Sequence, residues 1–343
     1  MVKMKKQPNK IALIADQNVL QLFPHYVDTL GFNAPVFVFS VLSGEHNKSI
    51  EEAVYLWQNL LENQFDKHSL IINFGGGMVS DLGGFVASTY QRGIPFINIP
   101  TTLLSMIDAA VGGKNGINLN GVKNVVGTIN LPEQVITDTL FLKTLSPMQM
   151  LDGFGEMLKY ALIGNSGLWH EIKDLENVKC HNIKKEWIDF CVSFKEKIVQ
   201  KDLYDQGLRH ILNFGHTIGH ALEAYYMQQC RNAKFCVSTE RNIPHGHAVA
   251  LGLVVESYLS YHHGLLSQRE YEEIREVVLK HYTDVIKQIS INDIDRIIDF
   301  CRMDKKNTDG KINVTMLEAI GQASPNHFVS KTECAEAINQ LFV

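Results

Sequence analysis

The stretch Leu70-Ile71-Ile72-Asn73-Phe74-Gly75-Gly76-Gly77, continued by Asp81-Leu82-Gly83-Gly84-Phe85, indicates the fold class of this chain. Its apolar run is typical of a buried parallel strand, and the glycines after it predict a tight turn into a helix over residues 81–90. Glycine lets a backbone approach a pyrophosphate closely, and a helix N terminus offers unpaired N–H donors. Because the spacing differs from GxGxxG, the turn alone is compatible with a nucleotide site or with a simple tight turn.

Strand and helix patterns alternate on both sides of this stretch. Short apolar runs predict strands at residues 11–15, 36–39 and 96–100, and apolar residues at helical spacing predict a helix over residues 49–63. Such alternation is typical of a parallel sheet whose strands are joined by helices. We therefore expect residues 1–145 to form an α/β Rossmann-like domain.

The pattern changes beyond residue 145, where long amphipathic segments follow one another with few β-branched runs. These segments span residues 149–163, 185–201, 213–228, 246–262, 267–288 and 292–302. Periodicity of this kind predicts helices. We expect residues 146–343 to form a mostly α-helical domain, with the active site in the cleft between the two domains.

The bulk composition is that of an ordinary globular protein, with 45% hydrophobic and 20% charged residues. A formal net charge of −5 argues against a dedicated binder of nucleic acid or anionic membranes. The N terminus does not resemble a secretory signal, and no apolar run approaches the ~20 residues of a membrane span. The six cysteines contain no CxxC pair. These features predict a cytoplasmic protein with reduced thiols.

Two histidines four residues apart, His216 and His220, are expected to share one face of a helix. Neutral imidazoles at this spacing suit a divalent metal, although an isolated pair is more often an ordinary pair of helix residues. Further candidate ligands favour the metal, because His245 follows the pair and Glu156 precedes it.

Polar residues follow the predicted strands, where ligands of open α/β sheets bind. Asp16 comes directly after the first strand and Glu45 shortly after the second. Each carboxylate is a candidate ribose ligand, and each equally suits a helix cap. Thr101-Thr102, after the strand at residues 96–100, suits the cap of a helix that contains Asp108.

Several cations lie near glycines or in the second domain. Lys114 and Lys123 occur near glycines in a poorly periodic segment, and Arg92 precedes Gly93. Each of them alone is best explained as solvated surface. Several cations in one cleft would suit an anionic substrate, because Arg binds carboxylates as a fork and Lys binds phosphate as a point charge. The second domain adds Lys195, Arg209, Lys305 and Lys306.

These features occur together, in this order, in the 3-dehydroquinate synthases of the sugar phosphate cyclase superfamily, which the chain resembles from Asp16 to Lys306. Besides the glycine-rich turn, the specific motifs are Pro100-Thr101-Thr102-Leu103-Leu104, Asp108-Ala109-Ala110-Val111-Gly112-Gly113-Lys114, Lys123-Asn124, Gly155-Glu156-Met157-Leu158-Lys159-Tyr160, Gly207-Leu208-Arg209, Asn213-Phe214-Gly215-His216-Thr217-Ile218-Gly219-His220, His245-Gly246 and Asp304-Lys305-Lys306. The resemblance implies a dehydroquinate synthase-like fold.

The resemblance also implies roles for individual residues. It makes Glu156, His216 and His245 the ligands of a zinc or cobalt ion, and His220 a proton-transfer residue that contacts substrate. It implies that NAD is bound by Asp16, Asn18, Glu45, Lys48, Gly76, Gly77, Asp81, Thr101, Thr102, Lys123 and the segment Phe141-Leu142-Lys143-Thr144. It implies substrate contacts by Asp108, Lys114, Asn124, Lys159, Lys195, Arg209, Asn213 and one of Lys305 and Lys306. Arg92 matches an arginine that reaches a neighbouring subunit, which implies a homodimer.

The implied reaction converts 3-deoxy-D-arabino-heptulosonate 7-phosphate, a small anionic sugar phosphate, to 3-dehydroquinate and phosphate in the shikimate pathway. It proceeds by transient oxidation by NAD, phosphate elimination, return of the hydride, ring opening and an intramolecular aldol, which makes the enzyme a phosphate-eliminating carbon–oxygen lyase. Lys114, Asn124 and Arg92 would hold the phosphate, and Lys195 and Arg209 the carboxylate.

The chain departs from the family pattern at a few positions. His247 stands where the family usually has Glu, Asn115 stands where Thr is usual, and the connection over residues 221–244 is longer. A histidine at position 247 would re-tune the metal site or offer a competing ligand. The alternatives are a related sugar-phosphate cyclase, a metal-dependent alcohol dehydrogenase of the glycerol-dehydrogenase type, and a catalytically inactive binding protein.

Overall fold

The apolar runs near the N terminus form a parallel sheet in the computed structural model, which describes residues 7–120, 122–232, 243–287, 289–302 and 311–342. Its hydrogen-bonded strands follow the order β2-β1-β3-β4-β7. They are β1 (Ile11–Asp16), β2 (Val36–Val41), β3 (Leu70–Gly75), β4 (Phe96–Pro100) and β7 (Gln134–Val135). Because β1 lies between β2 and β3, the direction of the strand connections reverses there, and the carboxyl ends of β1 and β3 mark the usual ligand site of such sheets.

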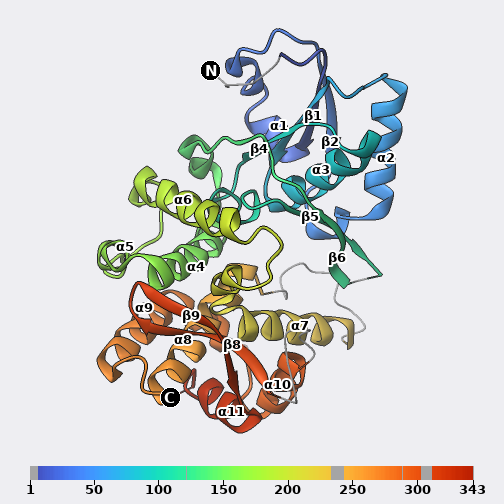
Figure 1. Cartoon of the computed structure of the whole chain (residues 1–343). Helices are drawn as coiled ribbons and strands as arrows, with labels where there is room; N and C mark the ends of the chain where they lie inside the picture. The colour runs from blue at the N-terminus through green and yellow to red at the C-terminus, as the bar shows by residue number, and fades with distance from the viewer. Residues whose placement is uncertain (1–6, 121, 233–242, 288, 303–310, 343) are drawn as a thin grey trace. The chain divides into compact units, whose positions relative to one another are not determined.

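Helices cover both faces of this sheet (Figure 1). On one face, α2 and α3 bury apolar residues against Ile14, Phe39 and Ile71. On the other face, Phe74 packs against Phe141 with ring centroids 5.6 Å apart. The helical elements are α1 (Gln17–Leu22), η1 (Val27–Leu30), η2 (Glu45–Asn47), α2 (Ile50–Glu62), α3 (Gly77–Thr89), η3 (Tyr90–Arg92), η4 (Ser105–Ala109) and η5 (Thr139–Thr144).

Some local expectations for this part of the chain were wrong. The helix after the glycine-rich turn begins at Gly77, before the expected Asp81, because Gly75 ends β3 and Gly76 alone forms the turn as the N-cap of the helix. β2 is an edge strand with Val38 54% exposed, although its apolar run is of the kind that buried parallel strands show. The poorly periodic segment with the lysines is an antiparallel hairpin of β5 (Lys114–Leu119) and β6 (Val122–Ile129). Its β6 side chains are largely exposed, so no apolar alternation marks the strand.

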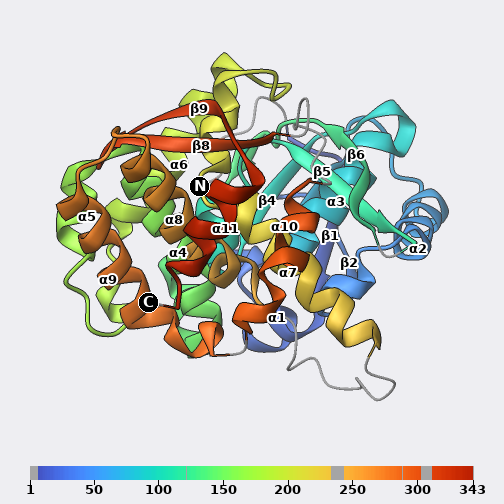
Figure 2. The ribbon, with the colours of Figure 1, turned by 90° about the horizontal axis from the view of Figure 1, so that it is seen from below.

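The chain divides into compact units at Met1–Ser146 and Pro147–Val343. The second unit contains α4 (Pro147–Gly164), α5 (Ser166–Ile172), η6 (Cys180–Asn182), α6 (Lys185–Lys201), η7 (Leu208–Asn213), α7 (His216–Asn232), α8 (His245–His262), α9 (Gln268–Ile286), η9 (Ile291–Asp293), α10 (Ile294–Arg302) and α11 (Lys331–Asn339). The expectation of a mostly helical domain here is confirmed. The sequence did not indicate β8 (Ile312–Ala319) and β9 (Gln322–Val329), which lie side by side as an antiparallel hairpin (Figure 2).

Helix α8 is the centre of the second unit. Its residues from Gly246 to Ser257 are all buried, and it packs against α4, α7, α9, α11 and β8. A helix that is apolar on every side needs such neighbours to remove it from water. In the described part of the chain, no helix has the length and apolar character that crossing a bilayer requires.

Candidate active site

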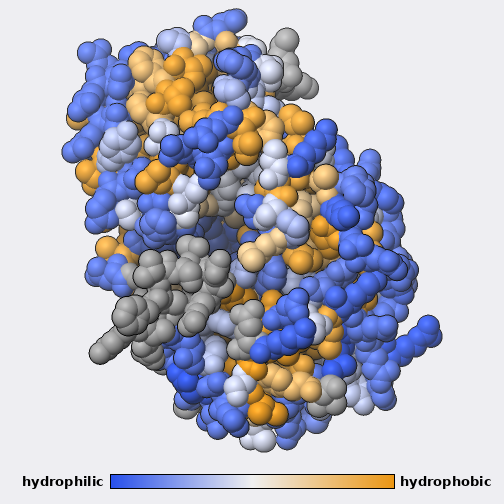
Figure 3. Space-filling model, turned by 180° about the vertical axis from the view of Figure 1, so that it is seen from behind, coloured by the Kyte–Doolittle hydropathy of each residue, from blue (hydrophilic) through white to orange (hydrophobic). Residues whose placement is uncertain are grey.

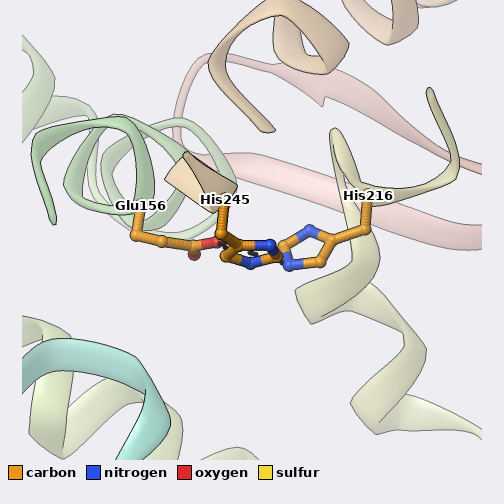
Figure 4. Close-up of side chains that lie close together, drawn as sticks. All are labelled: Glu156, His216 and His245. Carbon is orange, nitrogen blue, oxygen red and sulfur yellow. Dashed lines mark ion pairs between the residues drawn. The ribbon is translucent and has the colours of Figure 1, made fainter. Parts of the chain in front are cut away.

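Three helices of the second unit bring Glu156, His216 and His245 together (Figure 4). The Oε1 atom of Glu156, on α4, lies 3.3 Å from the Nε2 atom of His216, at the start of α7, and 3.3 Å from that of His245, at the start of α8. Glu156 is fully buried, and the imidazoles are 12% and 28% exposed. A carboxylate and two imidazoles converging from separate elements form the donor set of an open zinc or cobalt site.

Each imidazole is turned so that Nε2 faces Glu156. The Nδ1 atom of His216 lies 3.2 Å from the carbonyl of Phe214, and that of His245 lies 3.3 Å from Oε2 of Glu223. Because both partners can accept a hydrogen bond, the neutral form of either ring carries its proton on Nδ1 and turns its basic Nε2 toward Glu156. Both histidines are therefore held in the tautomer that a metal ion requires.

The charges around Glu156 also fit a cation. Burial alone would raise its pKa, but Lys159 and the imidazoles outweigh burial and hold the pKa of Glu156 well below its ordinary value. Burial and Lys159 lower the pKa of His216. Burial opposes the charged form of His245, yet its contacts with Glu156 and Glu223 raise its pKa well above the ordinary value. Among the described residues, neither oxygen of Glu156 has a hydrogen-bond partner of good geometry, so the residues fit a bound cation.

Glycines next to the ligands allow α4 and α8 to touch through their backbones. A Cβ atom on Gly155 would overlap the carbonyl of Gly246, and one on Gly246 would overlap the carbonyl of Asp152. The Asp152 carboxylate also accepts the N–H of Gly246 at 2.6 Å. This contact fixes where α8 starts and therefore sets the distance between Glu156 and His245.

The described residues contain a second group that could hold an ion, formed by His220, Glu223 and His245. His220 is exposed, and its ring centroid lies 5.3 Å from that of His216. His247 belongs to neither group of described residues. Its ring lies edge-on to Tyr282, with centroids 5.2 Å apart, and is 6% exposed. It is therefore a packed core residue and not a competing ligand.

Basic residues predicted to bind substrate are buried in the same unit. Lys159 on α4, Lys195 on α6 and Arg209 on η7 are 1%, 6% and 3% exposed, and η7 packs against both helices. Lys159 forms an ion pair with Glu156. Buried cations in proteins are normally paired with anionic or polar groups, as Lys159 is here with Glu156. Lys305 and Lys306 lie outside the described residues.

Asp202 holds the segment that carries Arg209. Its carboxylate accepts the backbone N–H groups of Gln206, Gly207 and Arg209 at 2.8 to 3.0 Å. These hydrogen bonds, chiefly those from Gln206 and Arg209, lower its pKa from 3.8 to about 2. The carboxylate therefore caps the start of η7.

Replacing Asp202 with Asn is expected to make the stability of the folded chain less dependent on pH in the acid range. Because the folded pKa is depressed, the carboxylate stabilises the folded chain above its ordinary pKa of 3.8, and this contribution is lost as the pH falls toward about 2. Thermal unfolding of both proteins across this range should show Asp202→Asn to be less stable at neutral pH, with a difference that narrows in acid. A difference that stays constant with pH would contradict the assignment.

At the carboxyl edge of the sheet, Asp16 and Asn18 lie beside the loop after β2. The Asp16 carboxylate accepts the N–H of Asn18 and the hydroxyl of Ser43, both at 2.8 Å. Asn18 donates to the same hydroxyl at 2.8 Å. Asp16 is thus the cap of α1, one of the two roles expected for it, and lies at the reversal point next to Gly75.

Lys48 joins residues from neighbouring loops at this edge. Its ammonium lies 3.0 Å from Asp81 on α3 and 3.0 Å from Glu45. Burial disfavours its charge, but Asp81 and Glu45 raise the pKa of Lys48 above its ordinary value. The side chain of Asn118 donates to Glu45 at 3.0 Å, which ties the β5–β6 hairpin to the same group. The structure thus brings together Glu45, Lys48 and Asp81, which the family resemblance implied for NAD.

The remaining predicted residues of the first unit occupy varied positions. The hydroxyl of Thr102 accepts the N–H of Ser105 at 3.2 Å, so Thr102 caps the turn as expected. Asp108 lies in the π-helical turn η4, a rare conformation found often at functional sites. The side chains of Phe141 and Leu142 are buried in the core, so a cofactor contact from this segment would use its backbone or its polar residues. Exposed side chains are those of Arg92, Lys114, Lys123 and Asn124.

Sequence reasoning missed two acidic residues beside the histidines. Glu223 follows His216 by seven residues, so it lies on the same helix face as His216 and His220, and this spacing was a usable signal. Glu256 is an isolated acid within the apolar run of α8, which was a second signal.

Residues 38–152 match the family described as 3-dehydroquinate synthase N-terminal, and residues 153–307 match that described as 3-dehydroquinate synthase C-terminal. The chain is 37% identical over 337 residues to the 3-dehydroquinate synthase of Parabacteroides distasonis, covering 96% of this chain and 91% of that protein. It is 38% identical over 324 residues to the enzyme of Enterococcus faecalis, covering 92% of this chain and 86% of that protein.

Solved structures share the fold at lower identity. A 2-deoxy-scyllo-inosose synthase complexed with carbaglucose-6-phosphate, NAD+ and Co2+ is 24% identical with a TM-score of 0.79, over 97% of this chain and 91% of the other. The 2-epi-5-epi-valiolone synthase from Streptomyces hygroscopicus, with NAD+ and Zn2+ bound, is 23% identical with a TM-score of 0.83, over 98% and 91%. A glycerol dehydrogenase from Schizosaccharomyces pombe is more distant, at 16% identity and a TM-score of 0.59 over 98% and 84%.

Proposed function

Because this chain belongs to the 3-dehydroquinate synthase family, we propose that it converts 3-deoxy-D-arabino-heptulosonate 7-phosphate to 3-dehydroquinate and phosphate in the cytoplasm. The reaction eliminates phosphate and makes the enzyme a carbon–oxygen lyase. The observation that carries the proposal is the group of Glu156, His216 and His245, with both Nε2 atoms 3.3 Å from one carboxylate oxygen and both Nδ1 atoms held by acceptors.

Residues of the second unit supply the binding and proton-transfer groups. When bound, a zinc or cobalt ion supplies a Lewis acid and NAD a hydride acceptor. Lys195 and Arg209, both buried, bind the substrate carboxylate, and Arg209 is oriented by its donation to the carbonyl of Leu203 at 2.9 Å. Lys159 and Asn213 position the substrate hydroxyls. His220 is exposed next to the ligand group and transfers protons.

NAD binds at the carboxyl edge of the sheet in the first unit. The glycine-rich turn before α3 presents backbone N–H groups to the pyrophosphate. The space beside Gly76 is open enough for a ligand to approach, because a Cβ atom there would meet only the Thr102 side chain, at 3.4 Å or more. Glu45 and Asp81 face the ribose, with Lys48 held between them. Further contacts come from Asp16, Asn18, Gly77, Thr101, Lys123, Lys143 and Thr144.

Lys114 and Asn124 of the β5–β6 hairpin bind the substrate phosphate, together with Arg92 of a second subunit. Asp108, which precedes Lys114 in the chain, also contacts the substrate. Arg92 is exposed at the end of η3, on a backbone with φ of 64°. A homodimer is further supported by exposed apolar side chains on the first unit, including Val36, Val38 and Leu42. Hydrophobic residues also gather on the upper part of the face seen in Figure 3.

The purified chain, loaded with metal and given catalytic NAD, is expected to release one phosphate for each heptulosonate phosphate consumed, without net accumulation of NADH. Phosphate release and absorbance of NADH measure the two quantities. Preincubation with a chelator should abolish the release, and added Zn²⁺ or Co²⁺ should restore it.

Other outcomes identify other functions. Phosphate release from sedoheptulose 7-phosphate alone would indicate a related cyclase, and steady NADH formation with a polyol would indicate a dehydrogenase. Metal binding without either activity would indicate an inactive binding protein.

A further inference from the structure

Two carboxylates outside the proposed ligand set lie beside the two histidine ligands. Helix α7 carries His216 and, two turns later, Glu223. Helix α8 carries His245 and, three turns later, Glu256. Each carboxylate contacts the histidine region of the other helix.

Glu256 holds the start of α7 from both sides of His216. Its Oε2 atom accepts the N–H of Gly215 at 2.8 Å, and its Oε1 atom accepts that of Thr217 at 3.2 Å. The side chain is fully buried. The first N–H groups of a helix lack partners within it and favour a negative charge, so a buried carboxylate is well suited to this place. Because both neighbours of His216 are bonded to one side chain, Glu256 fixes the backbone from which that imidazole projects.

The two helices approach closely enough for this contact because glycines lie between them. Gly215 has a φ of 79°, and a Cβ there would lie 2.7 Å from the Leu253 side chain and 2.9 Å from the carbonyl of Val249. A Cβ on Gly252 would overlap the carbonyl of Gly215. The backbone around His216 is thus pressed against α8 one turn before Glu256.

Glu223 makes the reciprocal contact, from α7 to the side chain of His245 on α8. Its Oε2 atom lies 3.3 Å from Nδ1 of that ring, and its side chain is 12% exposed. A carboxylate behind a metal-binding imidazole fixes both the tautomer and the ring orientation. The Nε2 atom of His245 is then left facing Glu156.

We propose that Glu223 and Glu256 are positioning residues of the metal centre, each located on the helix that carries the histidine held by the other. The inference rests on the proposed metal centre of Glu156, His216 and His245. In this arrangement a shift of α7 along α8 displaces both histidines at once, so ion binding depends on the register of the two helices.

The alternative use of Glu223 is as a ligand of a second ion with His220 and His245. An ion there would take the Nδ1 atom that Glu223 holds through a hydrogen bond. One ion per chain is therefore expected, and metal stoichiometry distinguishes the two uses.

The test is Co²⁺ binding to wild type, Glu223→Gln and Glu256→Gln, with Glu276→Gln on the exposed face of α9 as the matched control. Affinity is measured by competition with a chelator, and the ligand field is read from the visible absorption of the bound Co²⁺. We expect Glu223→Gln to bind Co²⁺ about 10- to 100-fold more weakly and with an altered spectrum, while the unfolding temperature of the metal-free protein changes little.

Glu256→Gln is expected to weaken binding at least as much, because an amide offers one acceptor oxygen for two N–H groups. If it does not fold, Glu256→Asp, which keeps both oxygens on a shorter stem, is measured in its place and should show the same weakening. Wild-type affinity and spectrum in the Glu223 and Glu256 variants would overturn the inference. So would a wild-type chain that binds two ions and loses one in Glu223→Gln, or one that binds none. Because the titration needs no substrate, it tests the roles of Glu223 and Glu256 even if the chain does not catalyse the proposed reaction.

Discussion

Replacing Glu156 with Gln is expected to abolish stoichiometric binding of Zn²⁺ or Co²⁺ and to lower phosphate release by about 10³-fold or more. The amide cannot supply the anionic ligand that both imidazoles face at 3.3 Å. It also leaves the buried ammonium of Lys159 without the carboxylate beside it. A metal ion typically contributes several kcal/mol of transition-state stabilisation, and each 1.36 kcal/mol is about a factor of ten in rate.

Metal content and phosphate release of Glu156→Gln measure this effect, with Glu276→Gln as the control for loss of an acidic residue elsewhere. Retention of one tightly bound ion by Glu156→Gln would show that Glu156 is not a ligand. Loss of activity with the ion retained would give Glu156 a role in substrate binding alone.

Replacing Gly246 with Ala is expected to cost about 3 kcal/mol of stability or more and to weaken metal binding without touching a ligand. The added methyl group would overlap the carbonyl of Asp152, and because this is backbone, α4 and α8 must separate. The same crossing sets the distance between Glu156 and His245, so separation pulls two ligands apart. The hydrogen bond from Gly246 to Asp152 is strained by the same movement.

Chemical unfolding and Co²⁺ affinity of Gly246→Ala test this expectation. Gly167→Ala is the matched control, because the added Cβ there, in the first turn of α5, would meet only the Asn165 side chain at 3.1 Å. Wild-type stability and affinity in Gly246→Ala would mean that the helices repack without moving the ligands.

The sequence predicted the strands that are buried on both faces of the sheet. The runs that became β1, β3 and β4 are apolar at nearly every position because both faces of a parallel sheet are covered. The β5–β6 hairpin was missed because its side chains lie mostly in solvent, so no apolar pattern was required of it. The β8–β9 hairpin was missed because the side chains of β9 are mostly exposed or half-buried, so no clear apolar alternation marks that strand.

The candidate site could be predicted only in part, because its residues come from helices that are separate in the sequence. The spacing of His216 and His220 indicated a helix face with metal chemistry, and their rings do lie 5.3 Å apart, but only His216 is grouped with Glu156 and His245. Motif resemblance supplied the other ligands, which come from helices far apart in the chain. Glu256 could not be placed without the structure, because its partners are backbone N–H groups of another helix. The location of the active site in a cleft between the domains, and the role of Lys305 or Lys306, stay predictions.

The meeting of Glu156, His216 and His245 from separate helices links metal loading to folding. An unfolded chain holds these residues far apart, so an ion binds them together only after α4, α7 and α8 have assembled. Binding to the native state alone then adds stability that grows with the logarithm of the free ion concentration, about 2.7 kcal/mol at 100 times Kd. Metal starvation would therefore shorten the lifetime of the second unit as well as slow its chemistry, and the abundance of the protein in a cell would follow the supply of the ion.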